Sequence, residues 1–334
     1  MRQPFAICLF TLLAVAGAAA AEPELAQRAR IQHEAQMAFI DEDYRKLDAM
    51  HREFLEGKSR TPSGIWKLSV FHSALGELLS DARRSPMREP QFATYERRLQ
   101  RWMKQFPESP APRIVHALLL GERGWAIRGG GYAHTVPAEA WAPFQRYIAQ
   151  SRQYLEEHKA LASKDPRWYQ AMLQNARAES WDEARYQALL DEALAREPLF
   201  YQTYFEALEN LLPKWHGDAE RIERFALDAV ERTAAQEGRG MYARIYWFAA
   251  QTEYGNDLFA KSRAAWPRMK EGFDDVVARY PDPWNLNNFA KFACLASDKA
   301  TTKALLERIG KDVVPAAWDP PPFREECAIW ASKP

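Results

Sequence analysis

The sequence predicts an all-α protein, an α-solenoid of degenerate tetratricopeptide-like helical hairpins that form one elongated, curved domain. A proline-aromatic start recurs at Pro166 and at Pro198, 32 residues later, and each start precedes two amphipathic stretches. Apolar side chains recur every three or four residues through most of the chain, and no convincing run shows the alternation of a β-strand. A period of 30-odd residues with two helices per unit is typical of stacked helical repeats.

The first 21 residues have the features of a secretory signal peptide. Arg2 supplies a positive start, residues 5–16 are almost wholly apolar, and residues 17–21 are small, as a cleavage site requires. The apolar run is too short to cross a bilayer, and no later stretch approaches about 18 consecutive apolar residues. We therefore expect residues 1–21 to be removed and residues 22–334 to form the helical domain of an exported protein, periplasmic or secreted, without a transmembrane segment.

Regularly spaced apolar side chains outline the first helices in turn. One face runs from Tyr44 to Leu55, a second from Phe92 to Phe106, and a third from Phe144 to Leu155. Helix-breaking residues lie between such runs, and proline is tolerated in a first helical turn. The breakers are Pro62 with Gly64, Pro107 to Pro112, Gly129 to Gly131, Pro166, Pro198, Gly217, Gly238 with Gly240, and Pro281.

The later helices follow from the repeat. The unit that starts at Pro166 superposes on the unit that starts at Pro281 with one inserted residue. The segment 240–255 resembles a further first helix without its proline, and residues 318–330 are expected to cap the C-terminal end. Because one such unit cannot bury its apolar face alone, we expect the units to stack.

Charge and composition narrow the class of partner. Acidic and basic residues balance at 45 each, and no basic block points to nucleic acid. The chain contains 12 Trp, 13 Tyr and 17 Phe, most of which we expect in the core of the repeats, because aromatic side chains bury large areas.

Two cysteines remain after removal of the signal peptide. Cys294 and Cys327 form an even pair, which in an oxidising compartment is consistent with a disulfide. Two buried thiols are the alternative, because the spacing does not show that the side chains meet.

Several short motifs resemble a bacterial family catalogued as domain of unknown function 4034. They are Gly64-Ile65-Trp66-Lys67-Leu68, Arg128-Gly129-Gly130-Gly131-Tyr132-Ala133 with Thr135-Val136, Asp165-Pro166 with Trp168-Tyr169, Leu212-Pro213 with Trp215 and Gly217, Tyr242-Ala243-Arg244-Ile245, and Asn285-Leu286-Asn287 with Phe289-Ala290 and Phe292-Ala293-Cys294. The resemblance covers most of residues 22–334 and implies no known activity. The family pattern does not require His134 or His216, so it gives neither a role.

The insertion at residues 125–135 is the best candidate for a binding site. Three glycines allow close backbone approach, and Arg128, Tyr132 and His134 flank them with a cation, a phenol and an imidazole. Thr135 is placed to cap a helix that starts at Pro137. The alternative is a long connection whose glycines let the chain turn back.

A second insertion contains Trp215 and His216. If both insertions face one side of the solenoid, these two residues join Arg128, Tyr132 and His134 in one pocket. Two separate surface loops are the alternative, because spacing alone does not show convergence.

Catalysis, metal binding and cofactors have little support in the sequence. His33-Glu34 lacks a second histidine at the metalloprotease spacing, the seven histidines are scattered singly, and no nucleophile elbow occurs. Cys294 lies in an apolar helix and is interpreted as core. We therefore predict no catalytic residue, no metal and no cofactor.

Two functions remain open. The first is an exported scaffold that binds a protein or peptide partner in the cell envelope, because helical repeats present extended surfaces. The second is an envelope enzyme or small-ligand or glycan-binding protein that uses a pocket built from the two insertions, because aromatic rings can stack on sugars.

Overall fold

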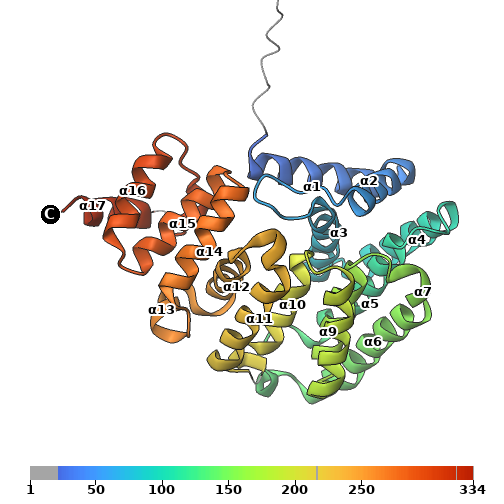
Figure 1. Ribbon diagram of the computed structural model, residues 1–334. Coiled ribbons are helices and arrows are strands. Elements are labelled where there is room, and N and C mark those ends of the chain that lie inside the picture. The colour runs from blue at the N-terminus through green and yellow to red at the C-terminus, as the bar shows by residue number, and fades with distance from the viewer. Residues whose placement is uncertain (1–21, 216, 321, 334) are drawn as a thin grey trace, which may run out of the picture.

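The computed structural model describes residues 22–334 apart from 216, 321 and 334 (Figure 1). Within these residues the all-α prediction is confirmed, and the only β-type pairing is an isolated bridge between Arg60 and Trp66. The predicted signal peptide and His216 lie outside the described residues. No helix in the described part of the chain is long and apolar enough to cross a membrane.

Short connections join most of the helices. The α-helices are α1 Glu24–Ile40, α2 Tyr44–Gly57, α3 Lys67–Arg84, α4 Arg88–Gln105, α5 Ala111–Arg128, α6 Ala138–Glu157, α7 Lys159–Ala162, α8 Arg167–Ala178, α9 Glu183–Arg196, α10 Tyr201–Leu211, α11 Ala219–Glu237, α12 Gly240–Ala249, α13 Leu258–Lys261, α14 Trp266–Arg279, α15 Pro283–Leu295, α16 Lys299–Ile309 and α17 Phe323–Ser332. Short helical turns are η1 Ala133–Thr135, η2 Pro213–Trp215, η3 Ala250–Tyr254, η4 Gly255–Asp257 and η5 Pro315–Ala317.

The helices form two layers. In the first layer α1 packs on α3, α3 on α5, α5 on α8, α8 on α10, and α10 on α12. In the second layer α2, α4, α6, α9 and α11 each pack against the first-layer helices before and after them. Pairs of helices therefore begin where the prolines predict them, with α8 directly after Pro166 and α10 shortly after Pro198.

Two clusters of buried apolar side chains fill the space between the layers, and they meet on α5. Ile114 and Ala117 of this helix belong to the C-terminal cluster, whereas Val115 and Leu119 belong to the N-terminal one. Residues three or four apart share a face of a helix, so α5 gives one face to each cluster. The largest fully buried side chains are aromatic, which agrees with the expected use of Trp, Tyr and Phe in the core.

The first helix lies against a helix near the other end of the chain. α1 packs on α15, and the backbone N–H of Glu24 donates to Oδ2 of Asp282 at 3.2 Å (Figure 1). The Glu24 side chain is fully buried and accepts hydrogen bonds from Thr61 Oγ1 at 2.9 Å and from the Ser63 N–H at 2.7 Å. The row of helices thus closes on itself through these contacts.

The segment 58–66, which links α2 to α3, strengthens this closure. Arg244 of α12 donates from Nη2 to the carbonyl oxygen of Ser63 at 2.7 Å. The Arg244 and Arg60 guanidinium groups both lie over the rings of Tyr201 and Tyr280, at 4.8–6.0 Å from the ring centroids. Residues 58–66 are therefore held by side chains from the C-terminal half of the molecule.

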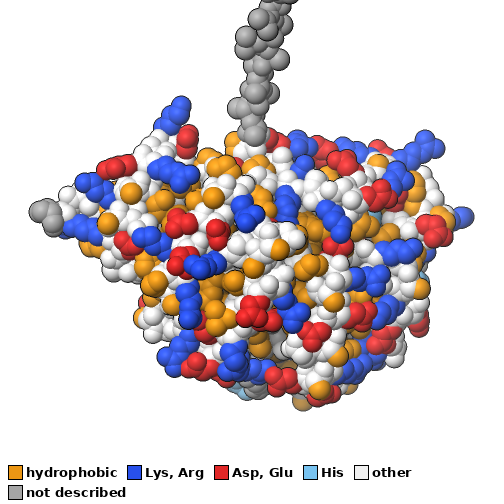
Figure 2. All heavy atoms as spheres, viewed as in Figure 1, with side chains coloured by type: hydrophobic (Ala, Val, Ile, Leu, Met, Phe, Trp, Pro, Cys, Tyr) orange, Lys and Arg blue, Asp and Glu red, His pale blue; other side chains and the backbone are white. Residues whose placement is uncertain are grey.

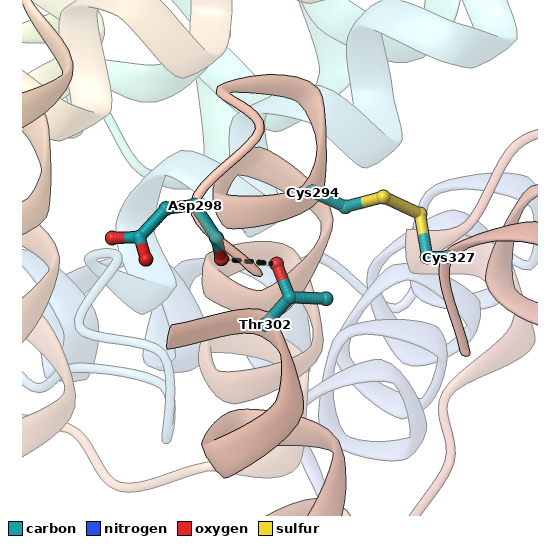
Figure 3. The surroundings of a disulfide bond; sticks show 4 residues. All are labelled: Cys294, Asp298, Thr302 and Cys327. Atoms are coloured by element: carbon teal, nitrogen blue, oxygen red, sulfur yellow. Dashed lines mark hydrogen bonds between the residues drawn. A yellow bond between two sulfur atoms is a disulfide. The ribbon is translucent and has the colours of Figure 1, made fainter. Parts of the chain in front are cut away.

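The C-terminal helix is attached covalently. Cys294 at the end of α15 and Cys327 in α17 form a disulfide, with the sulfur atoms 2.04 Å apart (Figure 3). Beside this bond, the Thr302 hydroxyl donates to the backbone carbonyl of Asp298 at 2.8 Å. The predicted C-terminal cap corresponds to α17.

The face shown in Figure 2 carries both signs of charge without a large field of either. Lys and Arg side chains alternate with Asp and Glu over the face shown in Figure 2, and small apolar areas lie between them. The balance of charge in the sequence is therefore also a local balance on this face.

Candidate functional site

The predicted loop after α5 is held together by Arg128. Its guanidinium lies 5.2 Å from the Trp125 ring and 5.1 Å from the Trp141 ring, and Nη1 donates to the carbonyl oxygens of Gly129 and Gly131 at 3.1 and 3.0 Å. Partial burial lowers the pKa of Arg128 from its ordinary value. Arg128 therefore donates hydrogen bonds to the backbone of its own loop.

Tyr132 is the most exposed large hydrophobic side chain of this loop. It is 74% exposed, and its ring stacks on that of His134 with 5.9 Å between centroids. The prediction that Thr135 caps the next helix is wrong, because its Oγ1 donates to the Tyr132 carbonyl at 2.8 Å. Pro137 occupies the N-cap position of α6, without a side-chain cap.

Trp215 lies in η2, after α10. The guanidinium of Arg177 lies 5.3 Å from its ring, and Arg177 also forms an ion pair with Glu206. Among the described residues, no hydrogen bond, ion pair or ring contact joins Trp215 to Arg128, Tyr132 or His134. The structure thus brings Tyr132 and His134 together, and it places Trp215 in a separate environment.

A cleft of about 300 Å³ lies near the C-terminal end, where α12 and η3 face α15 and η5. Two tryptophans, Trp247 and Trp284, lie in its lining with ring centroids 5.9 Å apart. The side-chain amides of Gln251, Asn256 and Asn288 lie beside them. Aromatic surface combined with groups that both donate and accept hydrogen bonds is typical of ligand pockets.

The backbone at the edge of this cleft is irregular. Residues 250–254 form a turn of π-helix, and Gly255 follows with a φ of +54°, a left-handed conformation that favours glycine. π-helical turns inside α-helices often occur at functional sites. Here the turn ends α12 and places Ala250 and Gln251 in the lining of the cleft.

The lining of the C-terminal cleft carries charges of both signs, from Lys291 and Asp319. Nζ of Lys291 donates to the carbonyl oxygen of Asp319 at 3.0 Å. Burial lowers the pKa of Lys291, and the nearby Asp319 opposes this effect. An ammonium group partly removed from water gains more from an anionic ligand than an exposed one does, because it is already poorly solvated.

A second arrangement lies at the other end of the molecule, between α2, α3 and the turn before α8. Nε2 of His51 and Nε2 of His72 each lie 2.7 Å from Oδ2 of Asp165. All three side chains are buried, and Asp165 is fully so. Asp165 Oδ1 accepts a hydrogen bond from the backbone N–H of Arg167 at 2.8 Å, which fixes the orientation of the carboxylate.

Burial and charge act in opposite directions on this cluster. Burial raises the pKa of Asp165, but His72 and His51 lower it more, so the pKa lies well below its ordinary value and the carboxylate stays ionised. Burial lowers the pKa of His72 despite the attraction of Asp165, which favours the neutral imidazole. In a neutral His72 the Nε2 that faces Asp165 carries the proton, and the lone pair lies on Nδ1, which is buried without a hydrogen-bond partner in the described chain.

His51 connects the cluster to an open cleft of about 360 Å³. The cleft is also lined by Asp48, one helical turn earlier on α2, by Ser109 before α5, and by Arg52 and Lys164. Within the described residues, Asp48 Oδ1 and Ser109 Oγ are buried without a hydrogen-bond partner. Such atoms favour binding of water or of a polar ligand.

From the sequence, each histidine was expected to be isolated, and Asp165 entered only as part of a family-like motif at the start of a repeat. The three residues are 21, 93 and 114 positions apart, so no local motif joins them. Only the packing of α2 on α3, and of the turn before α8 beneath them, brings them together. One sequence feature did point to Asp165: in Asp165-Pro166, an acidic residue stands directly before a helix.

Comparison of the chain with protein-family models, curated proteins and solved structures found no match. The arguments for function therefore rest on the geometry of the chain itself.

Proposed function

We propose that the chain is an exported helical-repeat protein of the cell envelope that binds a segment of a protein partner and carries out no catalysis. The two-layer packing of helix pairs supports a solenoid, because first-layer helices contact each other in chain order and the second layer covers them. The signal-like first 21 residues support export, and the motifs listed above support the proposed family resemblance.

The observation that carries the binding proposal is the C-terminal cleft. Trp247 and Trp284 offer apolar surface, and the amides of Gln251 and Asn256 match the donors and acceptors of a peptide backbone. Asn288 is buried, and its Nδ2 donates to the carbonyl oxygen of Trp284 at 2.8 Å. Lys291 offers a cation to an acidic side chain or a terminal carboxylate. Residues 58–66 already occupy the surface formed by Tyr201, Arg244 and Tyr280, so the proposed partner binds at the cleft.

The same lining favours a second candidate, a glycan ligand. Trp284 is only partly buried, and a sugar ring can stack on such a surface while side-chain amides bind its hydroxyl groups. The two candidates are distinguished by which ligand, protein or glycan, binds less tightly when residues of the cleft are substituted.

A pull-down from the native envelope tests the proposal with two double variants of the chain. Gln251→Ala with Lys291→Glu alters the cleft, and Tyr132→Ala with Trp215→Ala alters the two insertions. We expect one protein to be enriched by the parent chain and by the insertion variant, and its purified form to bind the cleft variant at least about tenfold more weakly, the loss of about 1.4 kcal/mol expected for one charge-assisted contact.

The opposite pattern, with binding lost only in the insertion variant, would move the site to the loops around Tyr132 and Trp215. If no protein is enriched by any form, the scaffold proposal fails. Titration with soluble envelope glycan fragments then tests the second candidate, which requires saturable binding that the cleft variant loses.

A further inference from the structure

We infer that His51, His72 and Asp165 form a binding site for a divalent transition-metal ion of the zinc class, with a coordination position open towards the neighbouring cleft. The three candidate ligand atoms all lie within 4.8 Å of one another. Two imidazoles and one carboxylate are a common ligand set for catalytic zinc and for non-haem iron. This inference is independent of the proposed binding of a partner at the C-terminal cleft.

The geometry is close to that of a metal centre. Both imidazole nitrogens point at one carboxylate oxygen, at 2.7 Å. Tetrahedral bonds to zinc of about 2.0–2.1 Å place ligand atoms roughly 3.3 Å apart, so each imidazole nitrogen needs to move away from Oδ2 of Asp165 by about 0.6 Å to admit an ion. The ligands come from three segments of the chain, and each is held by the packing of its own helix or turn.

The surroundings also fit an ion. The backbone N–H of Arg167 binds the second oxygen of Asp165, and such hydrogen bonds to the ligating carboxylate orient it in metal sites. The positive charge of Arg167 acts against a cation near His72, and the carboxylates of Glu206 and Asp165 partly offset that charge. Asp48 brings a second carboxylate to the cleft beside His51, with its buried Oδ1 unpaired in the described chain.

Access comes from the cleft beside His51. The imidazole of His51 lines this space, whereas His72 and Asp165 do not lie in its lining. An ion bound by the three side chains therefore has one ligand, His51, that also borders the cleft. Zinc held by three protein ligands keeps its fourth position for water or for a ligand. Asp48 lies one turn before His51 on α2 and lines the same cleft.

The test counts metal in the untagged chain of residues 22–334. The purified protein is stripped with EDTA, dialysed against micromolar Zn²⁺, and its metal content is measured by plasma mass spectrometry. Co²⁺ is then substituted, because its visible absorption reports the ligand geometry. We expect one ion per chain in the parent protein and none in His51→Gln or His72→Gln. His116→Gln is the matched control, a half-buried histidine beside Glu96, and it should retain the ion.

A conservative variant separates ligation from folding. His72→Cys supplies a thiolate in place of the imidazole, so it should still bind Co²⁺ and should add a sulfur charge-transfer band to the spectrum. If the parent chain binds no more Zn²⁺ than His72→Gln does, the cluster is a hydrogen-bonded packing element and the inference fails. Equal retention of the ion by both glutamine variants would overturn it as well, by placing the metal elsewhere. The metal count of the parent chain decides the question even if a variant does not fold.

Discussion

At the scale of single residues, side chains from the C-terminal half pack closely against the backbone of Gly64 in the segment 58–66. Gly64 has a φ of +93°, and a Cβ atom there would lie 2.7 Å from the Tyr280 ring and 2.9 Å from Arg244 Nη2. Gly57, seven residues earlier, has open space around it. The two glycines belong to the same stretch of chain, but only Gly64 meets both a conformational and a steric requirement for glycine.

We predict that Gly64→Ala destabilises the protein and that Gly57→Ala does not. The left-handed conformation alone costs an alanine about 1–2 kcal/mol, and displacement of the Tyr280 and Arg244 side chains adds to this. Gly57 ends α2 in a helical conformation, so alanine there should stabilise by up to about 1 kcal/mol. Urea unfolding measures both, and an equal effect of the two substitutions would contradict the role given to Gly64.

A half-buried histidine outside the proposed metal cluster should make stability depend on pH. Burial lowers the pKa of His116, against the attraction of Glu96. Below the ordinary value of about 6.5, the unfolded chain therefore binds a proton that the folded chain does not, and stability falls as the pH falls. When the pH falls from 7.5 to 5.5, the free energy of unfolding of the parent chain should decrease. In His116→Gln this decrease should be smaller, by up to about 1.4 kcal/mol. His33→Gln, at an exposed position, should behave as the parent does.

At the scale of elements, the aspartates that cap the helices differ in how many hydrogen bonds they accept. Asp182 caps α9 by accepting one hydrogen bond, from the backbone N–H of Arg185. Asp298 caps α16 by accepting from the Thr301 N–H, and its carboxylate also accepts from Trp266 Nε1 and Lys270 Nζ of α14, both at 3.0 Å. Asp298 thus links two helices besides starting one.

We predict unequal costs for removing these two caps. Asp182→Ala should cost about 1 kcal/mol, as a surface N-cap usually does. Asp298→Ala should cost about 2–3 kcal/mol, because Trp266 Nε1 and Lys270 Nζ lose an acceptor as well. Thermal unfolding of both variants under one set of conditions checks this, and similar losses would show that the bonds to α14 contribute little.

The helices could largely be predicted at this scale, whereas their long-range contacts could not. Periodic apolar residues and prolines indicated α2, α4, α6, α8 and α15, because those signals lie within one helix. The meeting of His51, His72 and Asp165 depends on three packed segments, and no spacing in the sequence encodes it. The C-terminal cleft likewise depends on a π-helical turn at residues 250–254, which apolar periodicity does not distinguish from an ordinary helix end.

At the scale of the whole molecule, the two halves are joined by a segment that carries two tryptic sites. Lys58 and Arg60 lie in residues 58–66, and Arg244 holds this segment through Ser63 while it stacks on Tyr201 and Tyr280. The halves have separate clusters of buried side chains that meet on α5. The contacts of the segment therefore add to the junction at α5.

We predict that Arg244→Met releases this segment to proteolysis. Methionine keeps part of the volume but removes the donor to Ser63 and the cation over both rings. Trypsin should then cut after Lys58 and Arg60 sooner than in the parent chain, by at least about tenfold for a loss of 1.4 kcal/mol when opening is fast relative to cleavage. Arg239→Met, an exposed arginine paired with Glu271, is the control and should leave the cleavage rate unchanged. Equal protection of both variants would mean that other contacts hold the segment.

The contact between α1 and α15 has a consequence for how the molecule is made. A ribosome releases Glu24 long before Asp282, which follows it by 258 residues. Until that partner emerges, the amide of Glu24 and the face of α1 that packs on α15 have nothing native to bind, and contacts of such long range slow folding. Among the described helices, α1 is thus synthesised first and is among the last to reach its final environment. A nascent chain that is interrupted before α15 lacks the native partner of α1.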